Sequence, residues 1–282
     1  MLMPESALQL VSRPDGFAEL TIDQPGSRAN ILTRALWDEL HAVLLTLTTG
    51  AACRGLILRS GKPNIFIAGA DLKYLGSVPA PDDPGVRELM EFGLATLDLL
   101  ENLPFPTCAV IDGAALGGGL EVTLACDYRV VGTNPSIELG LPEVKLGLIP
   151  GWGGTQRLPR LIPVTTAADM LMTGDSITAT DAIRCGLVDG KLATMALETL
   201  LESGQHALRR ATKRNPVPEA GRSTLTLYPT LPAVREALPV MAFGTSLPLA
   251  EGLKLETAAF VKLAGSDDSR QRIAAFFANR KK

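Results

Sequence analysis

Two carboxylates of this chain stand where acid–base chemistry could occur. Glu121 follows the run Gly113–Gly119, which ends in three consecutive glycines, and Glu143 is set among three leucines and a valine between Leu141 and Leu148. A carboxyl group buried among apolar residues has a raised pKa and can donate a proton near neutral pH. Two plainer interpretations stay open: Glu143 could be exposed in a loop, and Glu121 could only complement a helix dipole.

Two glycine-containing turns could offer backbone N–H groups to an anion. The run Phe66–Asp71 is an apolar strand that exits through a glycine, and Gly113–Gly119 opens a predicted helix. N–H groups in the first turn of a helix lack partners, and glycine lets a ligand approach them closely. The spacing matches neither the dinucleotide fingerprint nor a P-loop. Either turn could instead serve close packing of a helix on a strand.

Histidines and cysteines suggest no further chemistry. His41 and His206 lie in predicted helices far from any glycine-rich loop, so neither a His-based triad nor a common zinc site is expected. The cysteines have no metal-like spacing and are interpreted as small buried residues of a reducing compartment. They are Cys53, Cys108, Cys126 and Cys185.

Composition excludes several classes of protein. The chain has 282 residues, of which 46% are hydrophobic, and a formal net charge of −3. This near-balanced charge provides no basic field for nucleic acid. No apolar run is long enough to span a bilayer, and Met1–Asp15 lacks the features of a signal peptide. We expect a cytoplasmic protein.

Alternating strands and helices must position these residues. The predicted strands are Phe17–Ile22, Gly55–Leu58, Thr107–Asp112 and Tyr128–Val131. The predicted helices between them are Thr33–Leu47, Val86–Leu103 and a helix that runs from the Gly113–Gly119 turn through Ala125. This order indicates an α/β fold.

Helical patterns dominate after about Leu158. The predicted helices there are Thr165–Met172, Thr178–Cys185, Leu192–Lys213, Val234–Leu263 and Ser266–Asn279, with a long connector at Asn215–Pro232. The sequence thus predicts a mixed core with the active site over residues 1–190 and a helical region for packing or oligomerisation over 191–282.

Together the motifs resemble the crotonase (enoyl-CoA hydratase/isomerase) superfamily from about Phe17 to Val188, and more loosely to the end. The matching residues are Ala68–Leu72, Leu116–Gly119 with Glu121, Cys126–Asp127, Pro142–Glu143, Gly153–Leu158 and Ala182–Val188. Within the superfamily, Leu139–Leu161 and Pro25–Leu32 are most similar to the hydratase domain of the multifunctional fatty-acid oxidation complex α-subunit.

The resemblance implies a fold and a thioester site. The fold is a spiral of ββα turns that forms two roughly perpendicular sheets, followed by C-terminal helices. An oxyanion hole made by the N–H groups of Ala70 and Gly118 would hold the thioester carbonyl, each donor contributing about 3–4 kcal/mol by analogy with other oxyanion holes. The substrate-binding residues would be Ala68 (against the CoA adenine), Gly69, Asp71 and Gly117.

The resemblance also implies roles for the carboxylates. Glu121 would act as base toward the water that attacks Cβ, and Glu143 would supply the proton to Cα, the two titrating as a coupled pair. The implied enzyme is an enoyl-CoA hydratase, a lyase of fatty-acid β-oxidation that gives 3-hydroxyacyl-CoA. The alternative is a Δ3-Δ2-enoyl-CoA isomerase, which needs no attacking water. A non-catalytic or RNA-binding relative is disfavoured by the intact carboxylates and the lack of a basic stripe.

The expected partners follow from the same resemblance. Coenzyme A is part of the acyl-CoA thioester substrate, and no metal or redox cofactor is implied. We expect no nucleic acid and no membrane span. We expect a homo-oligomer, a trimer or hexamer built through the C-terminal helices, or else a domain of a larger oxidation complex. One departure from the family is Trp152, which stands where a smaller residue is usual and could narrow the acyl pocket, cover it or pack outside it.

Overall fold

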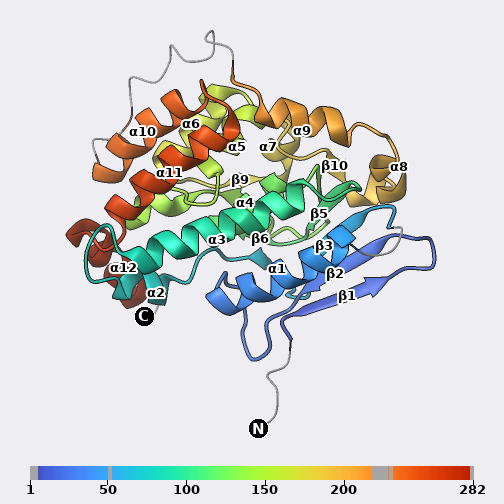
Figure 1. Cartoon of the computed structure of the whole chain (residues 1–282), viewed down its shortest axis with the longest axis horizontal. Coiled ribbons are helices and arrows are strands. Elements are labelled where there is room, and N and C mark those ends of the chain that lie inside the picture. Colours follow the sequence, from blue (N-terminus) through green and yellow to red (C-terminus); the bar gives the residue numbers. More distant parts are fainter. Residues whose placement is uncertain (1–5, 50–52, 218–227, 229–230, 280–282) are drawn as a thin grey trace. The chain divides into compact units, whose positions relative to one another are not determined.

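The computed structural model describes residues 6–49, 53–217, 228 and 231–279 (Figure 1). These residues form two compact units, each assembled from three segments of the chain. The first unit comprises residues 1–70, 95–139 and 178–210, and the second comprises 71–94, 140–177 and 211–282. The predicted boundary at residue 190 is not tested by this division and stays a prediction.

A six-stranded sheet forms the core of the first unit. Its strands, in spatial order, are β1 (Leu8–Ser12), β2 (Ala18–Ile22), β3 (Leu56–Ser60), β5 (Thr107–Ile111), β7 (Tyr128–Val131) and β10 (Gly190–Lys191). Strands β1 and β2 pair antiparallel, and every later pair is parallel. All residues of β5 and β7 are buried, as expected for apolar strands inside a parallel sheet.

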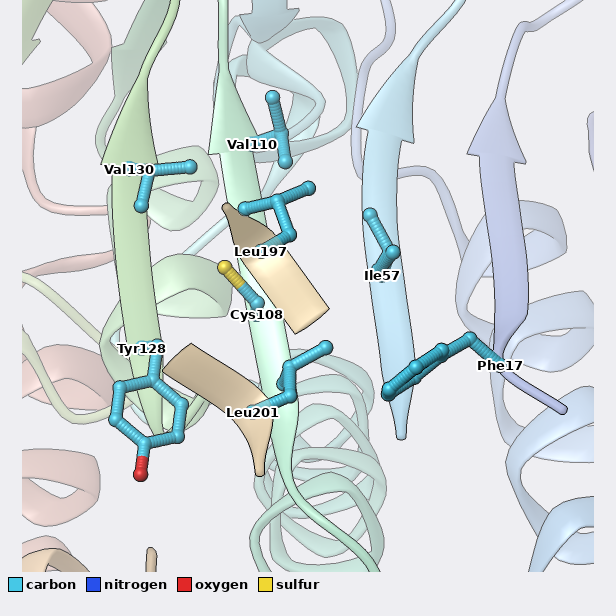
Figure 2. Close-up of a cluster of buried hydrophobic side chains, with 8 residues drawn as sticks. All are labelled: Phe17, Ile57, Cys108, Val110, Tyr128, Val130, Leu197 and Leu201. Atoms are coloured by element: carbon cyan, nitrogen blue, oxygen red, sulfur yellow. The ribbon is translucent and has the colours of Figure 1, made fainter. Parts of the chain in front are cut away.

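One face of this sheet is covered by the short helix α8 (Leu197–Leu201). Figure 2 shows Leu197 and Leu201 of that helix clustered with Ile57, Cys108 and Val110 of the sheet. Phe17, Tyr128 and Val130 complete the cluster. Burial of these apolar side chains makes the six-stranded sheet rigid. It can therefore support the turns that follow strands of the smaller sheet, described next.

A smaller sheet has the strand order β4 (Ile65–Ile67), β6 (Ala114–Leu116), β8 (Glu138–Gly140) and β9 (Ile177–Thr178). Strands β4 and β6 pair in parallel, so their carboxyl ends lie at the same edge. The chain leaves β4 through Ala68–Ala70 and leaves β6 through Gly117 into α4 (Gly118–Ala125). These are the two glycine-containing turns that the sequence singles out.

The remaining helices are found in both units. Helices α1 (Arg34–Thr49) and α7 (Ala179–Arg184) belong to the first. The second contains α2 (Leu72–Ser77), the 3-10 helix η1 (Pro142–Leu146), α5 (Gly154–Leu161), α6 (Val164–Thr173), α10 (Pro232–Gly244), α11 (Leu249–Leu263) and α12 (Asp267–Asn279). Helices α3 (Pro84–Glu101) and α9 (His206–Arg214) include residues of both units, and η2 is Leu192–Thr194.

Most predicted elements are confirmed, and the errors have physical reasons. The predicted helix Leu192–Lys213 is wrong: it is broken into η2, α8 and α9, with Gly204 at φ +72° between the last two. The predicted helix Val234–Leu263 is also wrong, because the chain forms two helices, α10 and α11. Pro248 lies directly before α11 and interrupts the helical pattern there. Strand β6 lies inside the run predicted as one turn, Gly113–Gly119.

Other predictions concern single residues. His41 and His206 lie in helices α1 and α9, as predicted. Cys108 and Cys126 are buried, whereas Cys53 and Cys185 are only half-buried. Most of the connector Asn215–Pro232 lies outside the described residues. None of the helices in the described ranges combines the length and apolarity needed to cross a bilayer.

Candidate active site

The turns after β4 and β6 lie against one another. A Cβ atom added to Gly69, whose φ is +114°, would be 3.1 Å from the Leu116 carbonyl oxygen and 4.0 Å from the Gly118 nitrogen. Gly119, one residue further into α4, contacts the backbone of Ile67 so closely that any side chain there would collide. The two turns can approach this closely only because both consist of glycine at the contact.

Two amides at these turns have no hydrogen-bond acceptor among the described residues. Ala70 follows Gly69 in an isolated parallel bridge with Leu32, and Gly118 is the first residue of α4. Within the described part of the chain, neither the Ala70 N–H nor the Gly118 N–H donates a hydrogen bond to a protein acceptor. Unpaired N–H groups at a helix start favour an anionic ligand. Whether both groups point at one atom stays a prediction.

Glu121 is the one ionisable residue of a wholly buried helix. All eight residues of α4 are buried, and Glu121 is 1% exposed. Acidic side chains are almost never fully buried without a polar environment or a function. Because Glu121 lies in the first turn of α4, the alternative that it only complements the helix dipole stays open beside the catalytic interpretation.

Glu143 lies in η1, in the second unit, and has a buried carboxyl oxygen. Its Oε2 atom accepts no hydrogen bond from any described residue. Burial, with a smaller contribution from the negative charge of Glu256, raises the pKa of Glu143 to about 8 against the lowering effect of a backbone hydrogen bond. A carboxyl with this pKa holds its proton at neutral pH and can deliver it as a general acid. The alternative of an exposed loop position is wrong.

A third carboxylate, which the sequence analysis did not identify, is Glu256 of α11. It is 0% exposed and accepts hydrogen bonds from the Gly153 N–H at 2.5 Å and the Thr155 N–H at 2.8 Å. The Thr155 hydroxyl donates a third, at 2.5 Å. The pKa of Glu256 is raised to about 7, because burial outweighs these hydrogen bonds and the positive charge of Arg157, which lower it. Its signal in the sequence was a carboxylate four residues from Gly252 and Phe260, on the buried face of the helix.

The comparison with protein families decides the assignment. A family model described as enoyl-CoA hydratase/isomerase matches residues 12–219. The chain belongs to this family. The fatty acid oxidation complex subunit alpha of Shewanella halifaxensis (strain HAW-EB4) is 38% identical over 293 residues, which cover 97% of this chain and 41% of that subunit. The corresponding subunit of Shewanella baltica (strain OS155) is 36% identical with the same coverage.

Solved structures of the family have the same architecture. Enoyl-CoA hydratase from Bacillus anthracis is 32% identical, with a TM-score of 0.61 and 97% of each chain covered. Enoyl-CoA hydratase from Bacillus halodurans reaches a TM-score of 0.71 at 22% identity, over 96% of this chain and 100% of that one, and shows the fold alone. The predicted superfamily, the likeness to the α-subunit and the α/β fold with two sheets and C-terminal helices are confirmed. The chain spans about two fifths of the length of its curated relatives.

The resemblance to the family also predicted substrate-binding residues in and near the turns after β4 and β6. Gly117 is buried at φ +54° as the residue before α4, and Ala68 is exposed, with its N–H donating to the Asn30 carbonyl at 2.8 Å. The Asp71 carboxylate accepts from the N–H groups of Lys73 and Tyr74 and so caps α2. These contacts are structural, and substrate binding by Ala68, Gly69, Asp71 and Gly117 stays a prediction.

Trp152, the residue at which this chain departs from the family, is buried. Its side chain is 2% exposed and packs on Gly93 of α3, where a Cβ atom would collide with the indole nitrogen. The donors to Glu256 follow Trp152 directly, Gly153 as the next residue and Thr155 in the first turn of α5. Within the second unit, Gly153 and Thr155 thus hold the Glu256 carboxylate, whose charge contributes to the raised pKa of Glu143. Glu121 belongs to the first unit, and its meeting with Glu143 stays a prediction.

Proposed function

We propose that this family member is an enoyl-CoA hydratase, which adds water across the trans-2 double bond of an enoyl-CoA to give a 3-hydroxyacyl-CoA in fatty-acid β-oxidation. The observation that carries the proposal is the buried Oε2 atom of Glu143, which accepts no hydrogen bond from the described residues, together with the raised pKa of this carboxyl. A proton held there near neutral pH is what protonation of Cα requires.

In the proposed reaction, the Ala70 and Gly118 N–H groups hold the thioester oxygen. Negative charge develops on this oxygen when water attacks Cβ, and fixed backbone dipoles stabilise it without reorganising. Both amides lack a protein acceptor among the described residues, which leaves them available for this oxygen. Coenzyme A enters as part of the substrate, and no other cofactor is required.

The two carboxylates divide the proton transfers. Glu121 removes a proton from the attacking water as its oxygen bonds to Cβ, and Glu143 gives its proton to Cα as the double bond is lost. The burial of Glu121 in α4 supports this role, because a buried side chain is held in a fixed position from which it can meet the attacking water. Product release leaves Glu121 protonated and Glu143 ionised, so one proton passes between them or through solvent before the next cycle.

A Δ3-Δ2-enoyl-CoA isomerase is the second candidate. Isomerisation moves one proton along the acyl chain, and a single carboxyl such as Glu143 could remove and return it. The absence of a donor on its Oε2 among the described residues would suit that task as well. The hydratase ranks first because Glu121, which isomerisation does not need, is retained and buried.

The experiment that tests the proposal follows the fate of water oxygen. The enzyme is given a trans-2-enoyl-CoA in water enriched in heavy oxygen, and the product is analysed by mass spectrometry. Hydration places the heavy oxygen on C3 and removes the absorbance of the conjugated thioester. Conversion of a 3-enoyl-CoA to a 2-enoyl-CoA without oxygen uptake, together with no hydration, would support the isomerase instead.

A further inference from the structure

The buried side chain of Asn30 has no part in the reaction described above. It belongs to Pro25–Leu32, one of the two stretches most similar to the oxidation-complex α-subunit, and it is 0% exposed. A buried side-chain amide is costly unless its polar atoms find partners. The partners of Asn30 therefore show what this residue holds in place.

The Asn30 amide joins the ends of strands in the first unit. Its Nδ2 group donates to the carbonyl of Ile22, the last residue of β2, at 2.8 Å, and to that of Phe66 in β4 at 3.0 Å. The Ser60 hydroxyl, at the end of β3, lies 3.0 Å from the same nitrogen. The Oδ1 atom accepts from the Gln24 N–H at 3.0 Å. These contacts fix residue 30 against strands of both sheets.

The backbone around Asn30 is bonded to the turn after β4. The Ala68 N–H donates to the Asn30 carbonyl at 2.8 Å, and the Leu32 N–H donates to the Gly69 carbonyl at 2.9 Å. Leu32 also forms the isolated parallel bridge with Ala70. Gly69 lies between the two bonds and has a φ of +114°, which glycine adopts readily. Segment 30–32 thus holds the turn on both sides of its most unusual backbone conformation.

One of these bonds sets the direction of the Ala70 N–H. The Gly69 carbonyl and the Ala70 N–H belong to the same planar trans peptide group, so they point in opposite directions. Because the Leu32 N–H binds the Gly69 oxygen, the Ala70 N–H points away from segment 30–32. A hydrogen bond accepted by the carbonyl also polarises the peptide group, so its N–H becomes a stronger donor.

We propose that Asn30 is a positioning residue, which holds segment 30–32 so that the Ala70 N–H is aimed at the thioester oxygen. The inference rests on the proposed function, in which Ala70 provides one of the two oxyanion donors. A donor stabilises developing charge best where it is already directed at the oxygen, since reorientation during the reaction would cost free energy. Asn30 acts through Leu32 and Gly69 and is not itself a catalytic residue.

The Gly118 N–H is directed by a different set of contacts. The Gly117 carbonyl, which shares a peptide group with this N–H, accepts from the Glu121 N–H at 3.1 Å. Helix α4 therefore orients its own donor. The Gly69 carbonyl instead lies outside any helix and depends on a segment that α1 and β3 separate from it in the chain. Loss of the Asn30 side chain should thus misdirect one donor and leave the other in place.

Isotope-edited infrared spectroscopy of the full chain tests the direction of the donor without turnover. The probe is butyryl-CoA, a saturated thioester that cannot be hydrated, labelled with carbon-13 at the thioester carbonyl. Hydrogen bonds to this oxygen lower its C=O stretching frequency, so binding to the wild type should move the band to a lower wavenumber than in water. In Asn30→Ala the band should move part of the way back, because a hydrogen bond weakens steeply when its donor is misaligned.

Kinetics give a second readout. Asn30→Ala should lower kcat for hydration by a factor of about 10–10² while KM changes little, because the oxyanion interaction is stronger in the transition state than with bound substrate. The matched control is Thr107→Val, which removes a buried hydroxyl that donates to the Asp127 carboxylate at 3.1 Å in the same unit. The control should lose stability in urea without a shift of the band or of kcat.

A second variant keeps the inference testable if Asn30→Ala does not fold. Replacement of Leu32 by its α-hydroxy acid changes one amide to an ester and deletes the donor to the Gly69 carbonyl. This change should move the probe band in the same direction as Asn30→Ala. The same replacement at Ala18, whose N–H donates to the Gly55 carbonyl at 2.9 Å, is the control and should leave the band where it is in the wild type.

The outcomes separate this inference from the proposed function. A wild-type band position in folded Asn30→Ala, or in the Leu32 ester, would overturn the inference even if the chain hydrates enoyl-CoA. An equal band shift in Thr107→Val would also overturn it, since any loss of stability would then have the same effect. A chain that shows the predicted band shifts but no hydration would refute the hydratase and leave the positioning role of Asn30 standing.

Discussion

Glu121 and Glu143 are the same residue type in two different settings, and these settings support the two different roles proposed for them. Glu121 is enclosed in a helix whose every residue is buried, whereas Glu143 has a buried oxygen without a donor in the described structure. Sequence reasoning could select both because the family motif is long. It could not find Glu256, because the donors to that carboxylate come from a loop about 100 residues earlier in the chain.

The raised pKa of Glu143 predicts a pH dependence. General-acid catalysis needs the protonated form, so kcat/KM for hydration should be maintained below pH 8 and fall as the pH rises through about 8, the pKa of this carboxyl. An ordinary glutamate would already have lost its proton near pH 4.5. Steady-state rates measured across this range, with thermal melts at each pH, check the prediction. A rate that instead rises through pH 8 would show that Glu143 acts as the ionised base.

Two adjacent glycines of α4 should respond differently to substitution. Gly118→Val places a side chain at the proposed oxyanion amide and should lower kcat by about 10²–10³ without unfolding the protein. Gly119→Ala would collide with the Ile67 backbone and should instead destabilise the fold by about 1–3 kcal/mol. Turnover and urea denaturation of both variants test the pair. Wild-type turnover in Gly118→Val would refute the oxyanion assignment.

At the scale of elements, long apolar patterns were predictable and short contacts were not. Strand β2 follows from alternating apolar and polar residues, and β5 and β7 follow from apolar runs that are buried. Helix α1 follows from its cap at Thr33, whose hydroxyl accepts from the Leu36 N–H at 3.2 Å. Strand β6 has only three residues, and its pairing with β4 across about 50 positions leaves no local signal.

Asp71 belongs to the family motif Ala68–Leu72, and its observed contacts are structural because it caps helix α2. The Asp71 carboxylate accepts hydrogen bonds from Lys73 at 2.9 Å and Tyr74 at 3.2 Å. Asp71→Ala should therefore lower the free energy of unfolding by about 0.5–2 kcal/mol, the usual effect of a lost N-cap. Urea denaturation measures this, and Asp71→Asn, which can still cap, is the control. Equal loss in both variants would indicate that the charge, and not the cap, is what matters.

At the scale of the whole molecule, the curated relatives are longer than this chain, so they do not show its oligomeric state. The oligomeric state of this chain is therefore a prediction. The second unit exposes apolar side chains on α10, on α11 and between them: Phe243 is 69% exposed, Leu247 37% and Leu255 39%. Exposed apolar groups of this kind favour an interface.

We predict a homo-oligomer in solution. Light scattering at micromolar concentration should give a mass that is a multiple of the chain mass of 29.8 kDa. Phe243→Glu should reduce that mass, because a charge would replace an exposed apolar side chain. A wild-type protein that is only monomeric would instead support a domain whose C-terminal helices pack within a longer chain.

Glu121 and Glu143 are proposed to act together in one hydration reaction, one as the base and the other as the acid. The most direct test compares the hydration rates of Glu121→Gln and Glu143→Gln with that of the wild type, using a trans-2-enoyl-CoA and the loss of conjugated thioester absorbance. Both substitutions are nearly isosteric, so thermal melts should show folded proteins. Each variant should lose a factor of about 10²–10⁴ in rate, the usual effect of removing one general acid or base. Hydration by Glu121→Gln at the wild-type rate would contradict the two-carboxylate mechanism and place the isomerase first.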